Sequence, residues 1–133
     1  MSVLLVEDDP EDVTLTMRAL AQHHLVNHIH VARDGAEALT YLQDAERPRV
    51  ILLDLKLPKV TGLEVLKRIR QDERLRRVPV VILTSSREEP DIRQAYDLGV
   101  NSYIVKPVDI EQFVRAVSEA GLYWLLLNEP PSD

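Results

Sequence analysis

The sequence contains no cysteine among its 133 residues. A disulfide framework and a thiolate metal site are therefore excluded, which fits a reducing compartment. No apolar run is long enough to cross a bilayer, and the N-terminus leads directly into a strand-like segment rather than a targeting peptide. These absences indicate a cytoplasmic location and no membrane partner.

The chain also lacks an excess of basic residues. It has 16 Lys and Arg against 22 Asp and Glu, which gives a formal net charge of -6. Surfaces that bind nucleic acid are usually basic, so we expect no nucleic-acid partner. The one basic stretch, residues 67–77, also carries Asp72 and Glu73, and we interpret it as a solvated helix face with its following loop.

The length suits one domain with a real core, and the apolar fraction of 45% is ordinary for a globular protein. We expect a single domain over residues 1–128, a flexible tail over residues 129–133, and no output domain. Five apolar segments alternate with amphipathic stretches, which predicts βαβ units and a parallel sheet. These segments span residues 3–6, 27–31, 50–53, 80–83 and 103–105.

Helices are expected between the strands. Asp9 is a plausible N-cap in front of Pro10, and helical periodicity covers residues 35–44 and 62–71. Two further helices are opened by capping patterns, Ser86-x-x-Glu89 and Asp109-x-x-Gln112. The predicted fold class is therefore α/β, with five parallel strands and five helices on both faces of the sheet.

Four of the five apolar segments end in a chemically reactive residue. The four endings are Glu7-Asp8-Asp9, Asp54, Thr84 and Lys106. In a parallel sheet the carboxyl ends of the strands share one edge, and ligands of open α/β sheets bind there. The pattern places carboxylates, a hydroxyl and an ammonium in one crevice. A single acid after a strand is often only a solvated loop residue or a cap, but several such acids beside a lysine are not.

These motifs resemble the receiver domain of two-component response regulators over nearly the whole chain. Pro58 and Gly62 follow Asp54 at the spacing usual in that family, and Lys106 is followed by Pro107. The amino-acid sequence at residues 54–59, 96–99 and 123–124 resembles, more narrowly, that of the single-domain regulators paired with bacterial phytochromes. The resemblance implies a flavodoxin-like sheet in the order 2-1-3-4-5.

The resemblance also implies a function, that of a stand-alone switch rather than an enzyme, which catalyses only its own phosphorylation and dephosphorylation. Asp54 would accept a phosphoryl group from a sensor histidine kinase, with a bacterial phytochrome as the expected kinase. Mg²⁺ would be bound by Asp8, Asp54 and the backbone carbonyl of Lys56, and by Glu7 mainly through a water.

The resemblance assigns roles to further residues. Thr84 and Lys106 would bind phosphoryl oxygens, although a β-branched strand end and a snorkelling lysine are the ordinary readings of these two residues. Tyr103 resembles the family's switch aromatic, which turns inward when Thr84 is drawn to the phosphate. A half-buried strand tyrosine without a dynamic role is nearly as good an interpretation. The Lys106-Pro107 bond resembles the family's cis peptide.

Three alternative functions share part of this pattern. A haloacid-dehalogenase-type phosphatase also uses an aspartate nucleophile with Mg²⁺, but it would have a second acid two residues later, where this chain has Lys56. A chemotaxis-like single-domain regulator served by a non-phytochrome kinase is the second alternative. A degenerate receiver that only binds is disfavoured because Asp8, Asp54, Thr84 and Lys106 are all present.

The last feature is the apolar run at residues 122–127, which includes Tyr123, Trp124 and Leu126. A surface helix normally has a polar face, and this run has none. It either folds back onto its own core or pairs with a second chain. We expect a homodimer through the last helix.

Overall fold

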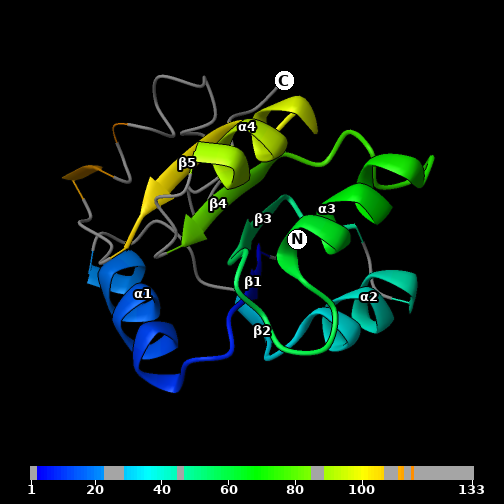
Figure 1. The fold of residues 1–133 in the computed structure, drawn as a ribbon. Helices are drawn as coiled ribbons and strands as arrows, with labels where there is room; N and C mark the ends of the chain where they lie inside the picture. The colour runs from blue at the N-terminus through cyan, green and yellow to red at the C-terminus, as the bar shows by residue number, and fades with distance from the viewer. Residues whose placement is uncertain are drawn as a thin grey trace, which may run out of the picture.

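The computed structural model describes residues 3–22, 29–44, 47–84, 89–106, 111, 112 and 115. Its centre is a parallel sheet whose strands follow the order β2-β1-β3-β4-β5, as the resemblance implied. The strands are β1 (Val3–Val6), β2 (Ile29–Ala32), β3 (Val50–Leu53), β4 (Val80–Thr84) and β5 (Ser102–Val105). Figure 1 shows this arrangement.

Four helices lie in the part of the chain that the structure describes. They are α1 (Pro10–Gln22), α2 (Gly35–Asp44), α3 (Gly62–Gln71) and α4 (Glu89–Asp97). Most of the expected fifth helix lies outside the described residues, but Glu111, Gln112 and Arg115 have helical backbone. None of the described helices has the length and apolar character needed to span a bilayer.

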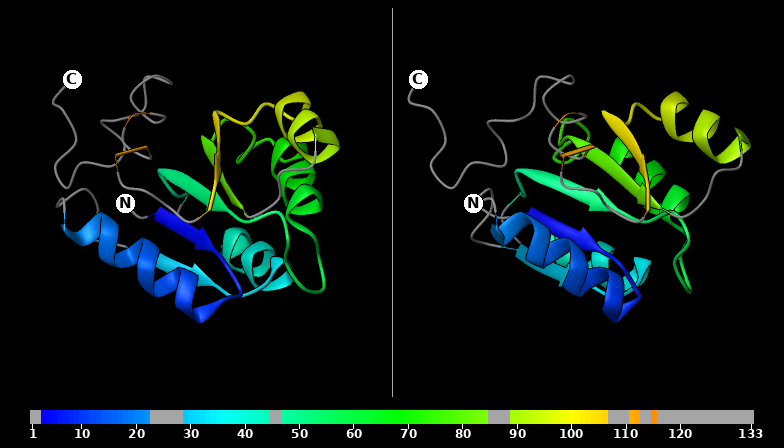
Figure 2. Two further views of the ribbon diagram at one scale, coloured as in Figure 1. Left: turned by 60° about the vertical axis from the view of Figure 1, so that its left-hand side comes forward. Right: turned by 90° about the vertical axis from the view of Figure 1, so that its left-hand side faces the viewer.

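The inner strands β1, β3 and β4 are buried on both faces over residues 3–6, 50–53 and 80–83, because helices cover both sides of the sheet (Figure 2). The edge strands β2 and β5 are buried only in part. Alternate strand residues enter opposite layers, since successive side chains of a strand point to opposite faces. On one face Leu5, Leu52 and Leu83 pack with Val13 and Leu20 of α1. The continuous apolar runs of the sequence thus correspond to strands with no solvated face.

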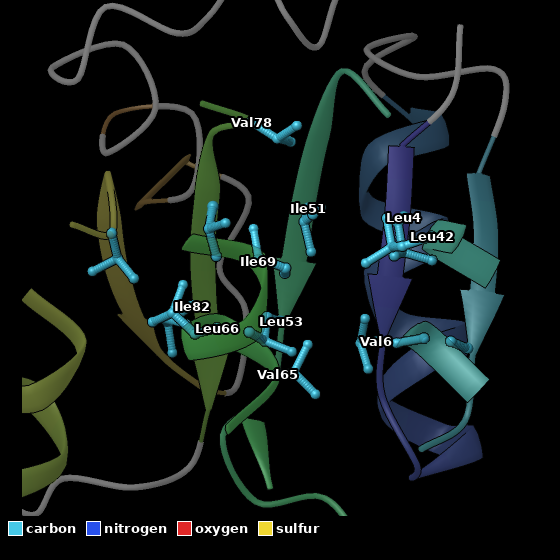
Figure 3. Packing of buried hydrophobic residues seen from close by; sticks show 14 of the residues in the cluster. Leu4, Val6, Leu42, Ile51, Leu53, Val65, Leu66, Ile69, Val78 and Ile82 are labelled. Atoms are coloured by element: carbon cyan, nitrogen blue, oxygen red, sulfur yellow. The ribbon is translucent and has the colours of Figure 1, made fainter. Parts of the chain in front are cut away.

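The other face carries the larger cluster, which Figure 3 shows from close by. Val6, Leu53 and Ile82 of the sheet pack against Leu42 of α2 and Leu66 of α3. Ala95 of α4 belongs to the same cluster. Two filled layers fix the positions of the strand ends, and these carry the site.

Arg70 corrects the interpretation of the basic stretch as a solvated face. Its guanidinium is half-buried and donates to the carbonyl oxygens of Leu98 (2.9 Å), Gly99 (2.9 Å), Val78 (2.9 Å) and Arg76 (3.0 Å). Burial lowers the pKa of Arg70 from its ordinary value. This side chain joins the end of α3 to the turn after α4, so one member of the basic stretch is structural.

Candidate functional site

Two acids stand side by side where β1 and β3 end. Val6 pairs with Leu53, so Glu7 and Asp54 leave the sheet at the same level. The ladder continues one residue further, because Glu7 N–H donates to Ala32 O (2.9 Å) and Asp54 N–H donates to Val6 O (3.0 Å). Backbone hydrogen bonds therefore fix both carboxylates at the sheet edge, where both residues are buried.

Lys106 follows β5 and extends across the sheet edge to these acids. Its ammonium donates to Glu7 Oε1 (2.6 Å), Asp12 Oδ2 (2.7 Å) and Asp54 Oδ2 (3.0 Å). Only 9% of the lysine side chain is exposed, against 4% for Glu7 and 5% for Asp54. Such buried, charge-assisted contacts are the strong class of hydrogen bond.

Asp12 is a site residue that the sequence pattern did not predict. It lies in the first turn of α1, which begins at the same sheet edge. The available signal was Asp9, whose side chain accepts from Glu11 N–H (2.9 Å) and so starts the helix beside the acid pair.

Glu7, Asp8 and Asp54 form a group that fits a divalent cation. Each offers a carboxylate oxygen, and the three oxygens lie within 4.8 Å of one another. Hard cations such as Mg²⁺ prefer carboxylate oxygens and keep several waters. Asp8 is exposed, which leaves one side of the group open to water. Lys56 donates its backbone N–H to Asp54 Oδ1 (3.0 Å) and so orients that carboxylate.

Burial and hydrogen bonding shift the pKa values of Glu7 and Lys106. Burial raises the pKa of Glu7 to about 7, although the hydrogen bond from Lys106 acts in the opposite direction. For Lys106, burial alone would lower the pKa, but the hydrogen bonds that it donates to Asp12, Glu7 and Asp54 outweigh burial and raise the pKa above its ordinary value. The lysine is therefore charged at neutral pH.

The loop between β3 and α3 is held close to Asp54. Gly62 N–H donates to Leu55 O (3.0 Å), and a Cβ on Gly62 would lie 2.2 Å from the Asp54 carbonyl oxygen. Lys59 adopts a positive φ of 66° within this loop and pairs with Asp34 at 3.4 Å. Only glycine fits at position 62 without moving the segment that carries Asp54.

Of the remaining predicted site residues, the structure describes Thr84 and Tyr103. Thr84 is the last residue of β4 and pairs with Val105, so its backbone lies next to the end of β5. Tyr103 is half-buried and packs against the larger core cluster. Pro107, Tyr123, Trp124 and Leu126 lie outside the described residues.

The similarity to known proteins covers most of the chain. Residues 3–118 match the response regulator receiver domain family. The chain is 46% identical to the probable methanogenesis regulatory protein FilR2 of Methanothrix harundinacea, over 97% of this chain and 86% of that protein. It is 38% identical to response regulator Rcp1 of Synechocystis, over 92% and 88%.

Solved structures give the same result. The bacteriophytochrome response regulator RtBRR is 53% identical, with a TM-score of 0.84 over 98% of this chain and 83% of that one. A Mn²⁺-bound form of Rcp1 has a TM-score of 0.80 at 36% identity over 98% and 99%. Receiver domains are phosphorylation-controlled switches that accept a phosphoryl group on an aspartate, bind Mg²⁺ and partner with histidine kinases. The chain belongs to the response regulator receiver domain family, among relatives that include bacteriophytochrome response regulators.

Proposed function

We propose that Asp54 is the phosphoryl acceptor of this receiver. The observation that supports this assignment is that both of its oxygens are held: Oδ1 accepts from Lys56 N–H (3.0 Å) and Oδ2 from Lys106 Nζ (3.0 Å). Asp54 is also buried, whereas Asp8 is exposed. A weak nucleophile such as a carboxylate depends on positioning and on nearby positive charge, and Asp54 has both.

The transfer itself is a simple displacement. An Asp54 carboxylate oxygen attacks the phosphorus of a phosphohistidine on the kinase. The new O–P bond forms as the P–N bond breaks, and the electron pair stays on the imidazole nitrogen, which then takes a proton from solvent. Lys106 stabilises the negative charge of the phosphoryl oxygens, and Thr84 is proposed to donate its hydroxyl to one of them. The chain would catalyse its own dephosphorylation at the same site.

A divalent cation completes the charge balance. Glu7, Asp8 and Asp54 are proposed to hold Mg²⁺, with the Lys56 carbonyl as a further ligand and Glu7 acting mainly through a water. The supporting observation is the spacing of the three carboxylate oxygens, all within 4.8 Å of one another. When bound, Mg²⁺ offsets the charge that accumulates on the transferring phosphoryl group.

The kinase is proposed to be a bacterial phytochrome. The similarity to RtBRR, at 53% identity, supports this choice. A regulator served by another kinase remains the second candidate because FilR2, at 46% identity, is named for methanogenesis. The phosphatase alternative gains no support, since Lys56 is an exposed lysine at the position where that chemistry needs an acid.

We also propose a cytoplasmic address and a receiver domain over residues 1–128. Two further proposals are a switch role for Tyr103 downstream of Thr84 and a homodimer through Tyr123, Trp124 and Leu126. The half-buried position of Tyr103 beside the core is compatible with rotation on signalling.

The test is phosphorylation by acetyl phosphate with Mg²⁺, followed by intact mass spectrometry. We expect one phosphoryl adduct that base removes, absent from Asp54→Asn. Asp97→Asn, which changes an exposed acid at the end of α4, is the matched control and should be phosphorylated normally. An adduct that persists in Asp54→Asn at the wild-type rate would move the acceptor elsewhere.

A further inference from the structure

In this structure, each of the three hydrogens of the Lys106 ammonium is bonded to a carboxylate. A lysine carries three N–H donors, and here they bond Glu7 Oε1 (2.6 Å), Asp12 Oδ2 (2.7 Å) and Asp54 Oδ2 (3.0 Å). The direction of each N–H therefore depends on the other two. Two carboxylates that hold two of the hydrogens aim the third one at Asp54.

Two of the three carboxylates bonded to Lys106 also belong to the candidate metal site. Glu7 and Asp54 belong to the carboxylate group whose oxygens lie within 4.8 Å of one another and of Asp8, and Asp12 does not. A cation held by that group would draw on the negative charge of Glu7 and Asp54, which weakens their attraction for the ammonium. Asp12 is therefore the carboxylate whose attraction for Lys106 is not weakened by a cation in that group.

Asp12 is also held in place from its own side. It lies in the first turn of α1, where the positive end of the helix dipole favours a carboxylate. The next residue, Val13, is buried against the sheet and fixes the orientation of the turn. The Asp12 side chain is 30% exposed, so it contacts the lysine from the rim of the site while Glu7 and Asp54 contact it from within.

We propose that Asp12 is a positioning residue, which keeps the Lys106 ammonium beside Asp54 when a cation occupies Glu7, Asp8 and Asp54. Asp12 touches neither the phosphoryl group nor the metal, and it acts only through Lys106. The proposal rests on the proposed function, in which Lys106 stabilises the phosphoryl oxygens.

The first test observes the lysine directly. In Mg²⁺-saturated wild type, the side-chain ammonium of Lys106 should give a resolved ¹H–¹⁵N NMR signal, assigned by its loss in Lys106→Gln. Asp12→Asn, which keeps the shape but removes the charge, should broaden or abolish the signal. Glu11→Gln is the matched control, because Glu11 is an exposed acid in the same helical turn. A signal that persists unchanged in Asp12→Asn, or that is absent from wild type, overturns the proposal.

The second test measures the rate of phosphorylation by acetyl phosphate at saturating Mg²⁺. Asp12→Asn should lower the maximal rate about tenfold, as expected for one hydrogen bond between charged groups. Its Mg²⁺ affinity by calorimetry should match that of wild type, which a general loss of structure would not allow. In a Lys106→Gln background, Asp12→Asn should have no further effect.

The outcomes distinguish a failure of the Asp12 proposal from a failure of the proposed function. If wild type accepts no phosphoryl group, the proposed function fails, and the Lys106 signal still decides whether Asp12 holds the lysine. A faster rate in Asp12→Asn would show that Asp12 competes for the lysine instead of positioning it. An equal slowing in the presence and absence of Lys106 would show that Asp12 acts by another route.

Discussion

At the scale of single residues, the site is a balance between acids that repel one another and one lysine. Glu7, Asp12 and Asp54 all bond to Lys106, and Asp8 lies beside two of them. Two like charges about 4 Å apart interact by roughly 4 kcal/mol at an effective dielectric of 20. The fold keeps this arrangement because the ammonium, and a cation when present, offset the repulsion.

The first prediction concerns Lys106→Ala. Removal of the ammonium leaves two buried carboxylates without their partner, and such a loss typically costs about 3–5 kcal/mol. We expect the midpoint of urea unfolding to fall in metal-free buffer and to recover in part with Mg²⁺. Lys67→Ala, at an exposed position of α3, should unfold like wild type. Equal midpoints for both variants without metal would contradict this account of the charge balance.

The second prediction concerns pH and Glu7. The pKa of Glu7 is raised from 4.5 to about 7 in the folded protein, so the folded state holds this proton more tightly than the unfolded state does. The stability that this proton contributes is present below pH 4.5 and is lost as pH rises to about 7. Each pKa unit corresponds to about 1.4 kcal/mol, so the loss is at most about 3 kcal/mol.

Glu7→Gln should remove this pH dependence from the metal-free protein. Chemical unfolding at pH 5 and pH 8 measures it: the free energy of unfolding should fall more steeply in wild type than in the variant. Glu11→Gln, which alters an exposed acid nearby, should keep the wild-type slope. Parallel pH profiles for wild type and Glu7→Gln would refute the buried, raised-pKa carboxyl.

At the scale of elements, the β3–α3 loop determines where Asp54 stands. Gly62 starts α3 directly against the Asp54 carbonyl, and Thr61 caps the helix by accepting from Glu64 N–H (3.3 Å). The loop is also held from α2, since a Cβ on Gly35 would lie 2.3 Å from Val60 O. Metal and phosphoryl binding at Asp54 therefore depend on backbone packing between three elements.

The third prediction uses two glycines to separate packing at the site from general stability. Gly62→Ala must displace the segment at Asp54, so we expect a loss of about 1–3 kcal/mol together with weaker Mg²⁺ binding. Gly99→Ala is strained at its φ of +76° but meets only Arg70 Nε at 3.6 Å, so it should cost about 1 kcal/mol without changing Mg²⁺ affinity. Calorimetry and urea unfolding of both variants decide the matter.

The elements show which features the sequence could predict. Strands and helices follow from apolar runs, caps and breakers, which are local, and the expected bounds of α2 and α3 are confirmed. Of the strand expected at residues 27–31, residues 27 and 28 lie outside the described residues, and β2 is observed as Ile29–Ala32, one residue longer at its C-terminal end. Asp12 was missed because its partner Lys106 lies 94 residues away. Arg70 was missed because two of its partners, Leu98 and Gly99, lie 28 and 29 residues away, and no local pattern encodes such contacts.

At the scale of the whole molecule, the site and the proposed dimer surface belong to different parts of the chain. The site is built from the ends of β1, β3 and β5 and the start of α1. The run at residues 122–127 lies outside the described residues, and the proposed dimer surface is supported by its sequence alone. Thr84 and Tyr103, on the paired strands β4 and β5, are the proposed link between the two.

The last prediction is that the chain forms a homodimer through the run that contains Tyr123, Trp124 and Leu126. A helix has one core-facing stripe, so a run that is apolar on all sides would expose a large patch that a second copy can cover. Aromatic anchors tend to dominate such contacts. Sedimentation of wild type at tens of micromolar should show a dimer, and Trp124→Ala/Leu126→Ala should show a monomer. Leu15→Ala, at an exposed position of α1, should remain dimeric. A monomeric wild type, with or without phosphorylation, would refute the dimer, and a dimeric double variant would move the interface to another surface.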